Sequence, residues 1–95
     1  AKNPKQIFVI LDEIKKVHDD VLLQLNSPSI NQHQLPSLIH KVKGGALLLQ
    51  ATRFIKGCES LEKEGDFLKQ LHAFKDLLLE QNQQIKRYQE KQIHL

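Results

Sequence analysis

Apolar residues recur every three or four positions along four stretches of the chain, the spacing that places them on one face of an α-helix. Clusters of Gly, Pro, Ser and Asn separate these stretches, as is typical of loops. Leu, Ile, Lys, Gln and Glu dominate the composition, which favours helix. The pattern predicts one all-α domain over residues 1–95, an up-down-up-down antiparallel four-helix bundle with helices at about 4–25, 33–50, 52–63 and 66–89.

Each predicted helix has one apolar face that should point into the core. In the first helix this face comprises Ile7, Leu11, Ile14, Val17 or His18, Val21 and Leu25, widened by Phe8 and Leu22. In the second it comprises Leu35, Ile39, Val42, Ala46 and Leu49, and in the fourth Leu68, Leu71, Phe74, Leu78, Ile85 and Tyr88. We expect these faces to meet in a single core.

Capping residues mark the expected helix ends. Asn3, followed by proline, predicts the start of the first helix, Thr52 the N-cap of the third and Asp66 that of the fourth. Gly57 inside the third helix predicts a close contact between two helices. The residues from Gln89 onward are polar, and we expect them to fray.

The second helix also has a distinctive outer face. Because residues three and four apart share one side of a helix, His40, Lys43, Gly44 and Leu47 should line up away from the apolar stripe. Glycines inside a helix cost about 1 kcal/mol each relative to alanine. Glycine is usually found at such a position because another helix, a ligand or a partner protein approaches the backbone closely.

The sequence His40-Lys41-Val42-Lys43-Gly44 resembles the His-x-x-Lys-Gly signature of histidine phosphotransfer (HPt) domains. The run 51–62, which ends in Leu-Glu, is similar to the next helix of that family, and the resemblance extends over roughly residues 7–88. One departure concerns Gln50, which stands where many members carry glycine, so the turn after the helix is expected to close differently.

The resemblance implies a phosphorelay intermediate, the C-terminal module of a bacterial hybrid sensor histidine kinase. His40 would accept a phosphoryl group from the aspartate of a receiver domain and pass it to the receiver of a response regulator. Lys43 would stabilise the charge on the phosphoryl oxygens. The partner-binding residues would be Gly44, Leu47, Lys41 and Phe8. We expect the isolated domain to have no enzymatic activity of its own and no cofactor, with Mg²⁺ held by the receiver.

Composition and charge exclude several kinds of site. The chain has a formal net charge of +3 and one cysteine, Cys58, which excludes an internal disulfide. Neither a glycine-rich nucleotide loop nor a spacing of His and Cys typical of metal ligands is present. Cys58 lies on an inner helical face, where a small core residue is expected.

Two other functions are compatible with a small helical domain. One is a helical adaptor that binds a partner without chemistry. The other is a basic nucleic-acid-binding bundle, which is disfavoured because the lysines are spread over every helix without interleaved aromatic residues. We therefore expect receiver domains as partners, with no nucleic acid and no direct membrane contact. The module is expected to be a cytoplasmic monomer, and its parent protein to be anchored in the inner membrane.

Overall fold

Four α-helices follow one another along the chain in the computed structural model, which describes residues 4–93 and the side chains of residues 6–91. They are α1 (Pro4–Leu25), α2 (Leu35–Leu48), α3 (Thr52–Lys63) and α4 (Phe67–Ile93). No strand occurs over that range, which confirms the all-α prediction. Within it, no helix combines the length and the apolarity that a membrane crossing needs.

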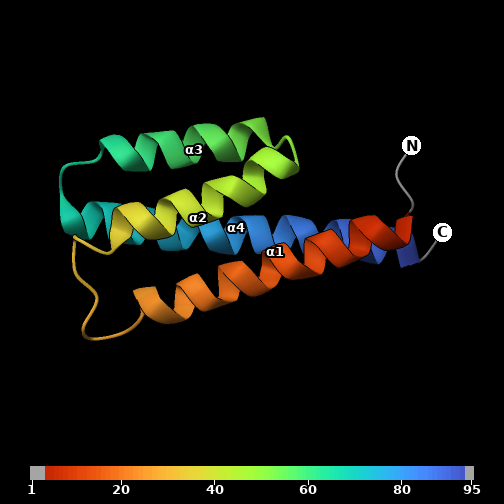
Figure 1. Cartoon of the computed structure of the whole chain (residues 1–95), viewed down its shortest axis with the longest axis horizontal. Helices are drawn as coiled ribbons and strands as arrows, with labels where there is room; N and C mark the ends of the chain where they lie inside the picture. Colours follow the sequence, from red (N-terminus) through yellow and green to blue (C-terminus); the bar gives the residue numbers. More distant parts are fainter. Residues whose placement is uncertain (1–3, 94–95) are drawn as a thin grey trace.

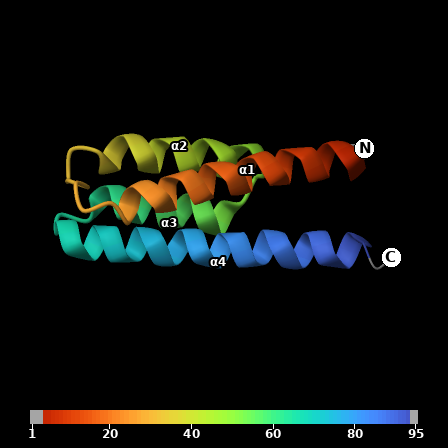
Figure 2. The ribbon, with the colours of Figure 1, turned by 90° about the horizontal axis from the view of Figure 1, so that it is seen from below.

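The two long helices and the two short helices form neighbouring pairs. α1 packs beside α4 and α2 beside α3, and α3 also contacts α4 while α2 contacts α1 (Figure 1). Figure 2 shows that α1 and α4 extend together beyond the turn between α2 and α3. The outer face of α2 is exposed to solvent at His40, Gly44 and Leu47.

The core has a larger and a smaller part. All four helices contribute to the larger part, whose members are Val21, Leu25, Leu35, Leu38, Ile39, Val42, Ala46, Phe54, Cys58, Leu61, Leu71, Phe74 and Leu78. The smaller part joins the extended ends of α1 and α4 and consists of Leu11, Ile14 and Ile85. Full burial of a side chain of this size contributes roughly 1.5–3 kcal/mol.

The predicted inner face of α4 is wrong at both ends of the helix. Leu68 is 61% exposed and Tyr88 is 43% exposed. In the first turn of α4 the half-buried Phe67 packs against the core in place of Leu68, since it lies one turn before Leu71. Near the other end, α4 extends beyond the turn between α2 and α3, so less of its surface is covered there.

The predicted fraying from Gln89 is also wrong, because α4 continues to Ile93. The side-chain amide of Gln89 donates a hydrogen bond to Asp12 Oδ1 of α1 at 2.9 Å. This bond and the nearby buried Ile85 hold the last turns of α4 against α1. Packing against the neighbouring helix thus extends a polar segment that would be only marginally helical in isolation.

The predicted caps have different outcomes. Asp66 caps α4 as expected, because its Oδ1 accepts a hydrogen bond from the backbone N–H of Lys69 at 3.0 Å. Thr52 does not cap α3: the N-cap position is Ala51, which gives no side-chain bond, and Thr52 is already helical. Asn3 lies outside the described residues.

α2 ends in a Schellman motif with Gln50 in the left-handed conformation. The backbone N–H of Ala51 donates to the carbonyl of Ala46 at 3.0 Å, and that of Gln50 to the carbonyl of Leu47 at 3.1 Å. Gln50 has a φ of 55°, a conformation that glycine adopts without steric cost. The turn was expected to close differently because of Gln50, but it has the backbone geometry that glycine favours.

Candidate functional site

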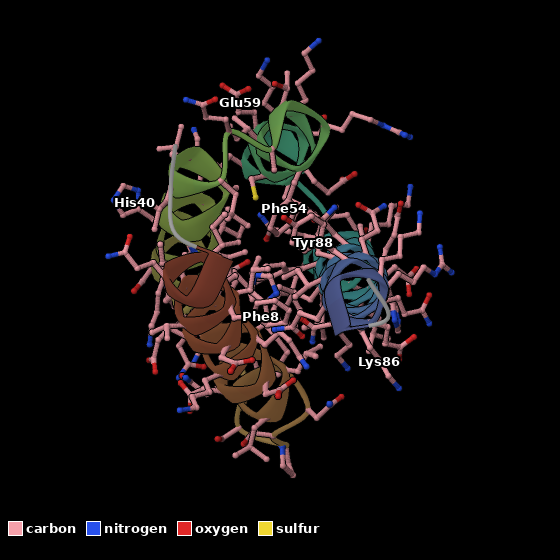
Figure 3. All side chains as sticks on the ribbon, turned by 90° about the vertical axis from the view of Figure 1, so that its right-hand side faces the viewer. Phe8, His40, Phe54, Glu59, Lys86 and Tyr88 are labelled. Carbon is pink, nitrogen blue, oxygen red and sulfur yellow. The ribbon has the colours of Figure 1, made fainter. Side chains whose placement is uncertain are left out.

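His40 lies in the middle of α2 and is exposed to solvent. Its orientation follows from its neighbours, because Ile39 is fully buried and Val42 is 1% exposed, so this side of the helix faces the core. Figure 3 shows the imidazole pointing outward from α2, away from the other three helices. Within the described part of the chain, the exposed imidazole takes part in no hydrogen bond or ion pair.

Lys43 leans from α2 toward α3 rather than projecting into solvent. Its Nζ lies 3.4 Å from Oε1 of Glu62 and 3.9 Å from Oε2 of Glu59, and 23% of its side chain is exposed. The contact to Glu62 is also a hydrogen bond. The residue expected to balance phosphoryl charge is thus engaged by two carboxylates, which the sequence analysis did not identify.

Gly44 leaves open space one turn from His40. A Cβ built on Gly44 would meet nothing within 4 Å, whereas one on the neighbouring Gly45 would lie 3.4 Å from Cγ1 of Ile14 in α1. Gly45 therefore serves helix packing, and Gly44 serves no packing contact within the domain. Leu47, the next residue along this face, is 57% exposed.

Leu48 is a second exposed apolar residue on this part of α2, at 56% exposure, and sequence reasoning missed it. A signal was present in the run Leu47-Leu48-Leu49. Consecutive helical residues point 100° apart, so three successive leucines cannot all face the core. Beside them, Leu48 and Leu49 line an open hollow of about 470 Å³ with Ile7, Leu11, Gln50 and Tyr88.

The structure does not bring all of the predicted site residues together. Lys41 lies on the α1 side of α2, where its Nζ is 3.7 Å from Asp20 Oδ2, and both side chains are about half exposed. Phe8 is half-buried on α1. In Figure 3 the side chain of Phe8 points toward α4, whereas that of His40 points away from α4. The face around His40 therefore comprises His40, Lys43, Gly44 and Leu47, with Lys41 at its edge.

Cys58 lies in the core near Lys43 and is fully buried, as expected. Burial raises the pKa of its thiol to about 11, while the nearby Lys43 lowers it and Glu62 and Glu59 raise it. The thiol therefore stays protonated at neutral pH and is not a nucleophile.

His18 is a second histidine with a defined environment, but it is structural. It is 1% exposed, its Nδ1 donates to Asn82 Oδ1 at 2.8 Å, and its Nε2 is buried without a partner. Its ring meets that of Phe54 edge to face at 5.6 Å between centroids. Desolvation lowers the pKa of His18, although the bond to Asn82 and the charge of Asp19 oppose this.

Over the described residues, no group of three or more His, Cys, Asp or Glu side chains is arranged to hold a metal ion. Comparison with protein-family models, with curated proteins and with solved structures gives no match to this chain.

Proposed function

We propose that this domain is an HPt-type phosphorelay module in which His40 accepts a phosphoryl group from a receiver aspartate and passes it to a response regulator. The observation that carries the proposal is the exposed, unengaged imidazole on a helix whose opposite side is anchored in the core. The free space at Gly44 gives an approaching partner access to the ring.

The chemistry needs little more than a positioned nucleophile. A lone pair of the neutral imidazole attacks phosphorus, an N–P bond forms, the P–O bond to the aspartyl carboxylate breaks, and that carboxylate leaves with the bonding electrons. Charge in the transition state is spread over the three equatorial oxygens, where an ammonium group stabilises it. Lys43, one turn along α2, would supply that ammonium group on leaving Glu62 and Glu59.

We also infer the up-down-up-down antiparallel topology for the bundle. The colour gradient in Figure 1 reverses direction along each successive helix, which supports it. We propose further that the domain is the C-terminal module of a hybrid sensor kinase, monomeric and cytoplasmic, and that Mg²⁺ is supplied by the receiver. The resemblance of the pentapeptide 40–44 is the support for this context.

Incubation with a phosphorylated receiver tests the proposal. We expect acid-labile label to appear on the domain and to be lost in His40→Gln, with the circular dichroism spectrum unchanged because the exposed ring makes no packing contact. His72→Gln is a matched control, since His72 is also exposed and helical. Undiminished labelling of His40→Gln, or equal loss in His72→Gln, would contradict the assignment.

A helical adaptor is the alternative that one observation favours. Leu47 and Leu48 expose apolar surface that could contact a partner without any chemistry. The same experiment separates the two functions, because an adaptor would bind a receiver without taking label from it.

A further inference from the structure

We propose that Glu62, assisted by Glu59, restrains Lys43 and so acts as an electrostatic brake on phosphorylation of His40. The inference rests on the proposed function. It assigns roles to two α3 residues that have no part in the phosphotransfer mechanism proposed above. Glu62 and Glu59 are positioning residues here, because they act through Lys43 and not on the phosphoryl group itself.

The first step of the argument is the geometry of Lys43. Its ammonium extends from α2 toward α3 and lies 3.4 Å from Glu62 Oε1 and 3.9 Å from Glu59 Oε2. His40 points away from α3, and Glu59 lies on the α3 side of α2 (Figure 3). A phosphoryl group on His40 and the two carboxylates therefore lie on different sides of the lysine and compete for it.

The second step concerns charge. Two carboxylates face one ammonium, so this cluster has a formal charge of −1 before any phosphoryl group arrives. A phosphoryl group brings two further negative charges at neutral pH. To stabilise it, Lys43 must leave Glu62 and Glu59, and the carboxylates left behind then repel the phosphoryl group.

The third step is the size of the effect. A single ion pair at a partly exposed position contributes little free energy. Its contribution corresponds to about a two- to fivefold change in an equilibrium constant or a rate. The brake is therefore a modulation of rate and lifetime and not a switch. The side chain of Lys43 is only 23% exposed, so its pairing is screened less than that of Lys16 with Glu13, whose side chains are 73% and 67% exposed.

Phosphoramidate provides a test without a receiver. A ring nitrogen of His40 forms an N–P bond as the P–N bond of phosphoramidate breaks, ammonia leaves, and the ring proton passes to solvent. Phosphorus NMR follows the formation and decay of phosphohistidine. We expect Glu62→Gln to raise the formation rate and lengthen the half-life about two- to fivefold, and Glu59→Gln/Glu62→Gln to do so further.

The Lys43→Ala background shows whether the effect passes through the lysine. There, the gain from Glu62→Gln should fall below about twofold, because only screened repulsion remains. Asp20→Asn is the matched control: it removes the same charge from another cross-helix ion pair on α2, Lys41–Asp20, and should change neither quantity. Urea unfolding of the Lys43 and Glu62 variants should show a favourable coupling in the absence of phosphate.

Several results would overturn the brake. They are a slower rate in Glu62→Gln, the same gain in the Lys43→Ala background, the same gain in Asp20→Asn, or no coupling between Lys43 and Glu62 in unfolding. If His40 takes label but the Glu variants match the wild type, only this inference fails. If neither phosphoramidate nor a phosphorylated receiver labels His40, the proposed function fails with it.

Discussion

His18 is the residue whose environment most directly links protonation to folding. The ring is buried against that of Phe54. Its Nδ1 donates a hydrogen bond to Asn82, and its Nε2 has no partner. A proton on Nε2 would place a charge in the core with no acceptor to receive it. Burial accordingly lowers the pKa of this group, and the folded state favours the neutral ring.

The free energy of unfolding should therefore fall in mild acid. The unfolded chain takes up the His18 proton near pH 6.5, whereas the folded chain takes it up only at lower pH. Stability from this group is fully present above about pH 7 and declines as the pH drops through 6.5 toward the folded pKa, by about 1.4 kcal/mol for each unit of lowering. Urea unfolding at pH 5 and pH 8 measures this difference.

His18→Gln isolates the contribution of His18, because the other titrating groups are common to both proteins. We expect the variant to be less stable at pH 8, where the packed ring is lost, and to show a smaller loss between pH 8 and pH 5. An equal pH dependence in wild type and variant would show that His18 is not the group responsible.

Gln50 carries a backbone cost that a single substitution should relieve. It is the one described non-glycine residue with positive φ, at the position that ends α2 in a Schellman motif. A side chain in the left-handed region costs roughly 1–2 kcal/mol relative to glycine, offset in part by the greater freedom of glycine in the unfolded chain. Gln50→Gly should stabilise the fold by about 0.5–1 kcal/mol and raise Tm by several degrees.

Gln50→Ala is the control for that prediction. Alanine keeps a Cβ and so keeps the strain, and it should leave Tm close to the wild-type value. If Gln50→Ala stabilises the protein as much as Gln50→Gly, the side chain of Gln50 and not its backbone conformation is the source of the cost.

At the scale of the element, α2 shows what periodicity can and cannot predict. The stripe from Leu35 to Ala46 is buried as expected, because helical spacing determines which residues share a face. The outward direction of His40 follows from the same spacing. The pairing of Lys43 with Glu62 does not, because it depends on how α2 and α3 are aligned along their lengths, and no local pattern encodes that alignment.

The ends of α4 show the same limit. Leu68 and Tyr88 fit the spacing of the inner face but are exposed, since burial depends on how far the neighbouring helices extend. Gln89, where fraying was expected to begin, likewise bonds to Asp12, far away in the sequence. Periodicity therefore predicts which residues share a helical face, but tertiary packing determines where along the helix that face is covered.

Gly44 allows the outer face of α2 to be tested separately from stability. Gly44→Ala adds a methyl group in open space within a helix and should stabilise the fold by about 1 kcal/mol. Gly44→Glu adds bulk and negative charge one turn from His40, so it should weaken association with a receiver while the fold stays intact. Receiver binding by titration calorimetry and unfolding in urea measure the two effects.

A loss of stability in Gly44→Ala would show that this position has a packing role. Unchanged receiver affinity in Gly44→Glu would show that partners do not dock on this face. Gly45→Ala is the matched contrast, because its Cβ would meet Ile14 at 3.4 Å, and we expect it to be less stabilising than Gly44→Ala.

At the scale of the whole molecule, the core is divided along the long axis. The larger part joins all four helices, whereas Leu11, Ile14 and Ile85 connect chiefly the extended ends of α1 and α4, with Leu49 packed beside them and Ile14 also lying against Gly45 of α2. His40 lies on α2, so the groups expected to carry its chemistry depend chiefly on the larger part. We therefore predict that the two-helix end loosens without displacing the candidate site.

Two core substitutions should separate these parts. Ile85→Ala should lower the free energy of unfolding by about 2–4 kcal/mol and accelerate amide hydrogen exchange mainly near Leu11 and beyond residue 85. Leu78→Ala, in the larger part, should cost a similar amount but accelerate exchange in all four helices, since Leu78 is fully buried among them. Phosphoryl transfer through His40 should survive Ile85→Ala at temperatures where the domain remains folded.

Equal acceleration of amide hydrogen exchange throughout the molecule in both variants would show that the two parts of the core unfold as one unit. The long helices would then have no end that unfolds independently.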